Sequence, residues 1–98
     1  MPAYVIVDID VTDPAGYEEH KRPAPPTLAL YGGRYLARGG ATEVLEGDWD
    51  SKRLAVLELA DRAQARQWFE SSECRPAREQ RHRTARTNMV VVDSAASP

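Results

Sequence analysis

The segment from Ala3 to Val11 alternates between two faces, and this pattern predicts the first β-strand. Its odd positions are all apolar, while its even positions change from apolar at Tyr4 to acidic at Asp10. The segment is rich in β-branched residues and is too short for a core helix. We therefore expect a strand with one wholly apolar face and one mixed face.

A helix is predicted to follow this strand. Asp13 is a typical N-cap residue, and Pro14 would stand at the first helical position, where its missing N–H costs nothing. The helix would carry Tyr17 and His20 before proline residues break or kink it. These prolines are Pro23, Pro25 and Pro26.

A further helical segment through Leu28 and Tyr31 is expected to end at Gly32, because glycine readily adopts the left-handed conformation of a helix C-cap. Arg34–Arg38 then predicts a strand.

Glycines separate this strand from the next part of the chain. Gly39-Gly40 predicts a tight turn or bulge, and Thr42–Glu46 a return or continuation of the same strand. Residues 47–50 form a loop in this interpretation. Arg53–Leu59 is the third strand, with successive residues facing opposite sides.

The last third of the chain predicts a helical region in two parts and a final strand. Asp61 would cap the first part, whose apolar residues share one side. Ser71-Ser72 interrupts it, and Ser72 would cap a second part that runs to about Arg86. Asn88–Asp93 predicts the fourth strand, and residues 94–98 a flexible tail.

The predicted element order is β-α-β-β-α-β, the ferredoxin-like arrangement, which packs the helices on one face of an antiparallel sheet. We expect a single α+β domain over residues 1–98. The other sheet face would be uncovered and yet apolar: it would carry Tyr4, Ile6, Leu54, Val56, and Met89 and Val91 or their alternates. A second copy of the sheet is the simplest cover, so we predict a homodimer.

Composition and charge narrow the class of protein. The 98 residues are 42% hydrophobic and 29% charged, as in one small globular domain. We expect no membrane span and no export signal, because neither pattern occurs. The net charge of −2 does not favour nucleic acid or anionic lipid, and a lone cysteine suits a reducing compartment. We therefore expect a cytoplasmic protein without membrane or nucleic-acid partners.

Several motifs together resemble one family. They are Tyr4-Val5-Ile6-Val7-Asp8, Asp13-Pro14 with Tyr17-Glu18, Tyr31-Gly32-Gly33-Arg34-Tyr35-Leu36, Arg38-Gly39-Gly40, Glu46-Gly47-Asp48-Trp49 and Arg53-Leu54. In this combination the chain is similar to the bacterial domain of unknown function 1330 family, over nearly its whole length. The resemblance implies the dimeric α+β barrel superfamily and the same sheet-to-sheet dimer. It implies no established reaction.

The histidines are the first candidates for chemistry. His20 and His82 have an ordinary pKa near neutrality, so each could serve as an acid, a base or a metal ligand. Neither has the spacing of a metal site, and we expect no metal and no cofactor. A catalytic role for His20 would rely on Tyr17 and Tyr31 nearby; the alternative is a partly exposed helix residue.

Arg38 is the second candidate catalytic residue. Its guanidinium fork matches a carboxylate, and the glycines that follow would let a ligand approach the backbone. The alternative is a salt bridge across the sheet to Asp8, Asp10 or Glu58.

Candidate ligand-binding residues are Tyr17, Tyr31, Trp49 and Trp68. For Trp68 on its helix, core packing with Phe69 is the favoured interpretation, whereas Trp49 in its loop would be either a dimer-rim anchor or a pocket lid. Cys74 lacks an obvious base, so we expect a buried small hydrophobe there.

The second helical region is basic, and its arginines are Arg62, Arg66, Arg75, Arg78, Arg81, Arg83 and Arg86. Acidic residues are interleaved with them, and no aromatic alternation suggests base stacking. We expect a solvated face.

These residues leave three functions open. The leading hypothesis is a small-molecule-binding domain with its pocket between helices and sheet, which could be a cofactor-independent enzyme. The family resemblance implies oxygenase, isomerase or lyase chemistry on aromatic or polyketide-like substrates. By the same resemblance, a haem-degrading monooxygenase would use Asp8, Trp68 and His82. The remaining alternative is a non-catalytic dimeric interaction module with a sealed core.

Overall fold

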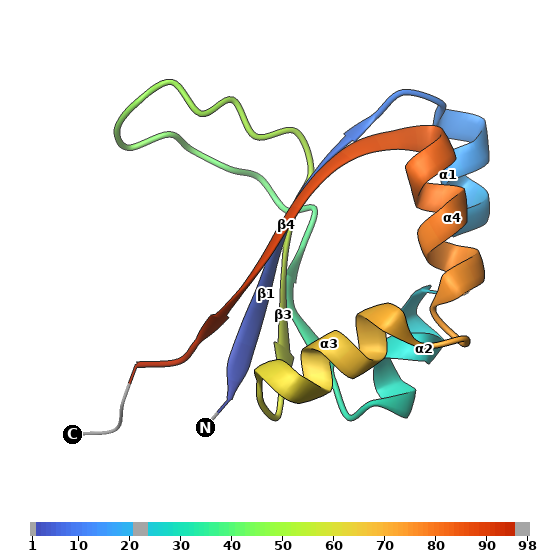
Figure 1. The fold of residues 1–98 in the computed structure, drawn as a ribbon. Helices are drawn as coiled ribbons and strands as arrows, with labels where there is room; N and C mark the ends of the chain where they lie inside the picture. Colours follow the sequence, from blue (N-terminus) through green and yellow to red (C-terminus); the bar gives the residue numbers. More distant parts are fainter. Residues whose placement is uncertain (1, 21–23, 96–98) are drawn as a thin grey trace.

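The computed structural model describes residues 2–20 and 24–95, which form a four-stranded antiparallel sheet with helices on one side (Figure 1). The strands are β1 (Ala3–Val11), β2 (Arg34–Arg38), β3 (Leu54–Leu59) and β4 (Ala85–Asp93). The helices are α1 (Pro14–His20), α2 (Ala24–Leu30), α3 (Arg62–Glu70) and α4 (Arg75–Thr84). The sheet order is β2-β3-β1-β4, so the predicted ferredoxin-like α+β fold is confirmed.

The core lies between the helices and the sheet face that they cover. β1 and β3 contribute their buried alternate residues, and the helices contribute a smaller set. The strand residues are Val5, Val7, Ile9, Ala55, Leu57 and Leu59, and the helix residues include Tyr17, Leu28, Ala65 and Trp68. The alternation predicted for β1 and β3 is therefore confirmed.

Three helix ends lie where local signals predicted them. Asp13 Oδ1 accepts a hydrogen bond from the Gly16 amide at 3.3 Å, and Asp61 Oδ1 accepts one from Gln64 at 2.7 Å. Gly32 adopts the left-handed conformation after α2, with a φ of 74°. In residues 2–20 and 24–95, no helix has both the length and the apolar character needed to cross a membrane.

The prolines separate two helices, α1 and α2. Pro25 and Pro26 lie in the first turn of α2, where their missing N–H groups would have no helical acceptor. The predicted break at Pro23 lies outside the described residues.

Two predicted boundaries around α4 were wrong. Ser72 does not cap this helix; instead Ser71 Oγ accepts a hydrogen bond from the Cys74 amide at 3.0 Å. The helix ends at Thr84 rather than near Arg86, and β4 begins at once. The reason is long-range pairing, because β4 matches β1 along its full length, as far as Ala85 opposite Val11.

The predicted tail begins at a residue that is hydrogen-bonded to the other end of the chain. The Ser94 amide donates a hydrogen bond to the Pro2 carbonyl at 2.9 Å, so Ser94 is still attached to the sheet. Residues 96–98 of the predicted tail lie outside the described residues.

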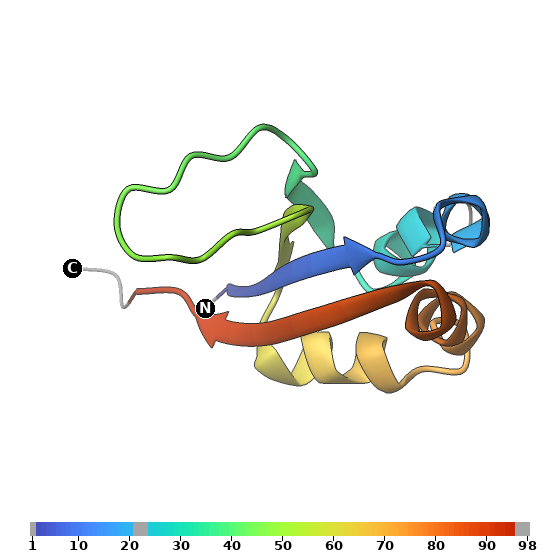
Figure 2. The same ribbon diagram turned by 90° about the horizontal axis from the view of Figure 1, so that it is seen from above.

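The predicted return or continuation of the strand at Thr42–Glu46 is also wrong. Residues 39–53 form a long loop, and residues 40–50 are exposed. Gly39 has a φ of 65°, which turns the chain out of β2, and the segment finds no partner strand in the described chain. The loop projects away from the helices (Figures 1 and 2).

The uncovered face of the sheet is apolar, as predicted. We call this surface the open face, and its apolar members are Tyr4, Ile6, Leu54, Val56, Val90 and Val92. Met89 lies opposite Val7 and faces the helices, as does Val91. The residues that β4 presents to the open face are therefore Val90 and Val92. The sequence of β4 is apolar on both faces, so only its register against β1 decides which of its residues lie on the open face.

Candidate functional site

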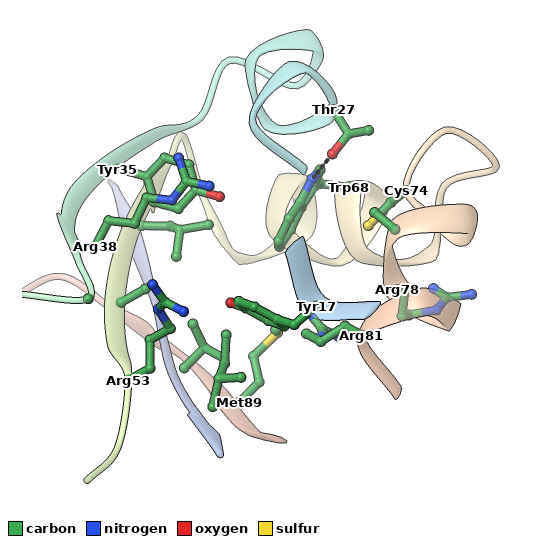
Figure 3. A pocket seen from close by; sticks show the side chains of 16 residues that line it. Tyr17, Thr27, Tyr35, Arg38, Arg53, Trp68, Cys74, Arg78, Arg81 and Met89 are labelled. Carbon is green, nitrogen blue, oxygen red and sulfur yellow. Dashed lines mark hydrogen bonds between the residues drawn. The ribbon is translucent and has the colours of Figure 1, made fainter. Parts of the chain in front are cut away.

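A cavity of about 390 Å³ lies between the sheet and the helices (Figure 3). Its floor is apolar and comes from the strands, whereas the helices and the end of β2 add aromatic and polar side chains. The lining residues are Val7, Ile9, Tyr17, Thr27, Tyr35, Arg38, Gly39, Arg53, Ala55, Leu57, Trp68, Cys74, Ala77, Arg78, Arg81 and Met89. Volume and lining are those of a typical small-molecule site.

A β-bulge in β2 directs Arg38 into this cavity. Tyr35 pairs with Leu57, but the next pair is Ala37 with Val56, so Leu36 is the extra residue. Without it, alternation would place residue 37 on the side of Tyr35 and would turn Arg38 to the open face. With it, Tyr35 and Arg38 both line the cavity.

Arg38 stacks on Tyr35, with its guanidinium carbon 4.6 Å from the ring centre. Burial raises the pKa of the Tyr35 phenol, and the neighbouring Arg38 opposes this rise. The phenol is therefore a neutral hydrogen-bond donor at physiological pH.

The salt-bridge alternative for Arg38 was wrong, because the proposed acidic partners lie on the other face of the sheet. Glu58 accepts a hydrogen bond from Arg34 Nε at 2.9 Å. Asp8 accepts hydrogen bonds from Trp49 Nε1 at 2.9 Å and from the Lys52 amide at 3.1 Å.

Tyr17 and Arg53 form a second aromatic–arginine pair. Tyr17 is only 5% exposed, and the Arg53 guanidinium carbon lies 5.2 Å from its ring centre. Figure 3 shows the Tyr17 hydroxyl pointing toward the side of the cavity that holds Arg53. A Cβ on Gly39 would lie 3.2 Å from Arg53 Nε, so the glycine leaves room for this arginine.

Trp68 forms another wall of the cavity. It is 5% exposed, and its Nε1 donates a hydrogen bond to Thr27 Oγ1 at 3.4 Å. Its predicted core role is confirmed, and the structure also places its indole at the cavity (Figure 3).

Helix α4 contributes two arginines to the cavity lining, and Cys74, the residue just before the helix, contributes a thiol. Burial raises the pKa of the Cys74 thiol against the opposing effect of Arg81 and Arg78, so the predicted small buried residue is confirmed. Arg81 is only 6% exposed, and burial lowers the pKa of its guanidinium. The solvated face expected for this helix was therefore wrong at Arg81.

A family model described as "Domain of unknown function (DUF1330)" matches residues 2–95. The chain belongs to the DUF1330 family. A search of curated proteins finds no match.

Solved structures share the fold of this DUF1330 domain at low sequence identity. A protein of unknown function from Rhodopseudomonas palustris is 14% identical, with a TM-score of 0.77 over 98% of this chain and 84% of that one. SnoaB, a cofactor-independent oxygenase from Streptomyces nogalater, is 13% identical, with a TM-score of 0.69 over 98% and 95%. A dimeric ferredoxin-like protein of unknown function from Jannaschia is 11% identical, with a TM-score of 0.71 over 96% and 100%. These likenesses show the fold.

Only part of the predicted site of the DUF1330 domain gathers at the cavity. Arg38, Tyr17 and Trp68 line it. Tyr31 does not; its hydroxyl donates a hydrogen bond to Glu73 at 3.1 Å outside the cavity. His20 ends α1, and its side chain lies outside the described part of the structure.

Trp49 lies on the opposite side of the sheet from the cavity. It is 59% exposed, and its Nε1 donates a hydrogen bond to Asp8, whose side chain points to the open face. This position favours the dimer-rim alternative over the pocket lid.

The three residues of the haem alternative do not converge. Asp8 is on the open face, Trp68 is in the core, and His82 is exposed on α4. Partial burial, together with Arg81 and Arg78, lowers the pKa of His82. Within residues 2–20 and 24–95, no group of three His, Cys, Asp or Glu side chains could hold a metal ion.

Tyr35, Arg53 and Arg81 were not predicted as site residues. For Arg81 a signal exists in the sequence, because Ala77, Arg81 and Thr84 are spaced four and three residues apart and form the buried stripe of α4. Arg81 is the charged member of a stripe whose other members are small. No comparable signal exists for Tyr35, whose role depends on which residues pair across the sheet.

Proposed function

We propose that this DUF1330 domain binds a small molecule in the cavity between helices and sheet. The observation that carries the proposal is the cavity itself, where an apolar floor meets convergent arginine, tyrosine and tryptophan side chains. A non-catalytic interaction module predicts a sealed core, so the cavity favours a ligand-binding protein.

The two tryptophans allow a direct test, because they lie on opposite sides of the sheet. Trp49→Phe leaves Trp68 as the only indole, and a panel of charged and uncharged naphthalene compounds should change its fluorescence saturably. Trp68→Phe is the control, since Trp49 should not respond to a ligand in the cavity. If no compound of the panel gives a saturable response in Trp49→Phe, the proposal is wrong.

We propose further that the bound compound is aromatic or polyketide-like and reacts without a cofactor. The support is the fold shared with SnoaB, which is described as a cofactor-independent oxygenase. Arg38 is the proposed catalytic residue at the cavity, and His20 remains a prediction because its side chain is not described. Mass spectrometry of bound compounds after incubation in air tests for turnover, and unchanged turnover in His20→Ala and Arg38→Gln would contradict these roles.

We also propose that the open face is covered by a second copy of the chain. Val90 and Val92 on this face are 61% and 47% exposed, and the loop that projects on this side exposes Leu45 to 91%. The Jannaschia protein, which shares the fold, is described as dimeric. A two-fold pairing of identical open faces would bury these side chains on both copies.

Adjacent residues of β4 provide a matched test of the dimer, because Val90 faces the open side and Val91 faces the helices. Val90→Glu should convert a dimer into a monomer in sedimentation velocity at micromolar concentration, whereas Val91→Glu should remain a dimer. A wild-type chain that sediments as a monomer would refute the proposal.

A further inference from the structure

The charges around the cavity identify a class of ligand. The arginines that line it are Arg38, Arg53, Arg78 and Arg81, whereas none of the lining residues that the structure describes is Asp or Glu. Several cationic groups, with no carboxylate among the described lining residues, give the cavity a positive potential that attracts anions.

Arg78 already has protein partners. Its Nη1 donates a hydrogen bond to the Phe69 carbonyl, and its guanidinium carbon lies 5.0 Å from the Phe69 ring centre. Figure 3 shows its side chain pointing away from the centre of the cavity. The positive charge available to a ligand therefore comes from the other three arginines.

The surroundings of Arg81 favour a bound anion. Its side chain is buried, with 6% of the residue exposed, and its Nε has no hydrogen-bond partner within the described part of the chain. The ion pairs of the described residues involve other basic side chains. A buried guanidinium is stable only when its charge and its N–H groups find acceptors, so a bound anion would supply what the protein does not.

Arg38 and Arg53 lie across the cavity from Arg81, next to Tyr35 and Tyr17 (Figure 3). Arg38 is exposed and also lines the cavity, which places it at the opening. Stacking on the tyrosine rings holds both guanidinium groups in position without neutralising their charge. They can therefore attract an anion to the opening and contact polar substituents of a bound ligand.

The remainder of the lining favours a planar apolar body. The floor contributes Val7, Leu57 and Met89, and Trp68 provides an aromatic wall. Flat carbon frameworks pack well against such side chains, and a cavity of about 390 Å³ accommodates one of moderate size.

We propose that the ligand is a planar organic anion whose charged oxygen atoms pair with Arg81 while its carbon framework lies on the apolar floor. The inference rests on the proposed small-molecule function and adds the class of ligand. Negatively charged oxygen can come from a carboxylate or from an acidic enol, and the guanidinium group can donate hydrogen bonds to both.

Titration calorimetry with three probes tests the charge. The probes are 2-naphthoate, the ionised form of 2-hydroxy-1,4-naphthoquinone, and the uncharged 2-naphthamide. At least one anion should bind about tenfold or more tightly than the amide, since charge-assisted hydrogen bonds are roughly twice as strong as neutral ones and the difference corresponds to about tenfold in affinity. The better of the two anions shows whether a carboxylate or an enolate is preferred.

Variants on α4 test the role of Arg81. Arg81→Met should weaken binding of the preferred anion by about 10- to 100-fold and leave the amide unchanged. Arg75→Met removes a charge from an exposed position on the same helix and should change neither affinity. Arg81→Lys keeps the charge without the fork and should lose less affinity than Arg81→Met.

The stability of the ligand-free protein separates a ligand-binding arginine from a structural one. If Arg81 lacks an anionic partner in the free protein, Arg81→Met should unfold at the same temperature as the wild type or a higher one. A lower unfolding temperature would indicate a structural role and contradict the proposal.

The probes also separate this inference from the proposed function. If the amide binds as tightly as both anions, or if Arg81→Met keeps the anion affinity, the ligand class is wrong and the small-molecule site stands. If none of the three probes binds at millimolar concentration, both proposals are overturned.

Discussion

The two faces of the sheet are built from alternate residues of the same strands, yet each lacks a different kind of partner. The helix-covered face encloses a cavity in which the buried Arg81 has an unpaired Nε. The open face has satisfied acids, such as Asp8 and Glu58, but exposes apolar side chains, including Val90. One face lacks a polar partner and the other lacks apolar contact.

This difference supports the two proposed kinds of binding. A buried unpaired charge is stabilised by a small ion, because a cavity excludes larger partners. A broad apolar surface is stabilised by another surface, because the gain grows with the area removed from water. The proposed ligand therefore belongs to the covered face, and the proposed second copy of the chain to the open face.

The largest expected effect comes from comparing the two tryptophans. Trp68→Ala should lower the free energy of unfolding by about 3–5 kcal/mol, because it removes a buried indole from the core. Trp49→Ala should lower it by about 0.5 kcal/mol or less when both are measured by urea denaturation in the Val90→Glu background. That background removes any dimer contribution. Equal losses would show that the two faces do not differ as described.

A smaller effect is expected from exchanging residues 37 and 38, that is, from combining Ala37→Arg with Arg38→Ala. Because the bulge at Leu36 puts position 37 on the open face and position 38 on the cavity side, the exchange should move the arginine out of the cavity. Affinity for the preferred naphthalene anion should fall by about tenfold, the effect of losing one charged contact. Unchanged affinity in calorimetry would contradict the role of the bulge in directing Arg38 to the ligand.

The smallest expected effect concerns Cys74 and pH. Burial raises the pKa of its thiol above the ordinary value of 9.0, so the folded state holds this proton at pH values where the unfolded state releases it. The free energy of unfolding should therefore fall as the pH rises above that ordinary value. Cys74→Ala should show a shallower fall in the same denaturation series. Equal slopes would mean that the thiol is not desolvated beside the cavity.

Local patterns in the sequence determined much of the fold. Asp13 and Asp61 mark helix starts because their side chains reach amides only three residues away. Gly32 marks a helix end because its conformation is a property of the residue itself. The alternation in β1 likewise assigned its two faces, and the order of the elements predicted the ferredoxin-like sheet.

The candidate site was determined mostly by tertiary structure. Tyr17, Arg38 and Trp68 could be proposed from residue type, but the sequence left open whether Arg38 faces a ligand or an acidic partner. Thr42–Glu46 has the composition of a strand and forms none, because a strand also needs a neighbour in the sheet.

The sequence predicts only part of the role of Arg81. Its spacing from Ala77 and Thr84 is that of a buried helix stripe, but its position among the arginines of a basic helix also suits a solvated charge. Tertiary packing decides between these outcomes: α4 packs against α1, α3 and β4, Arg81 is buried there, and its Nε has no hydrogen-bond partner within the described part of the chain. Helix caps and strand alternation depend on neighbours along the chain, whereas the charge balance of a cavity depends on residues that folding alone brings together.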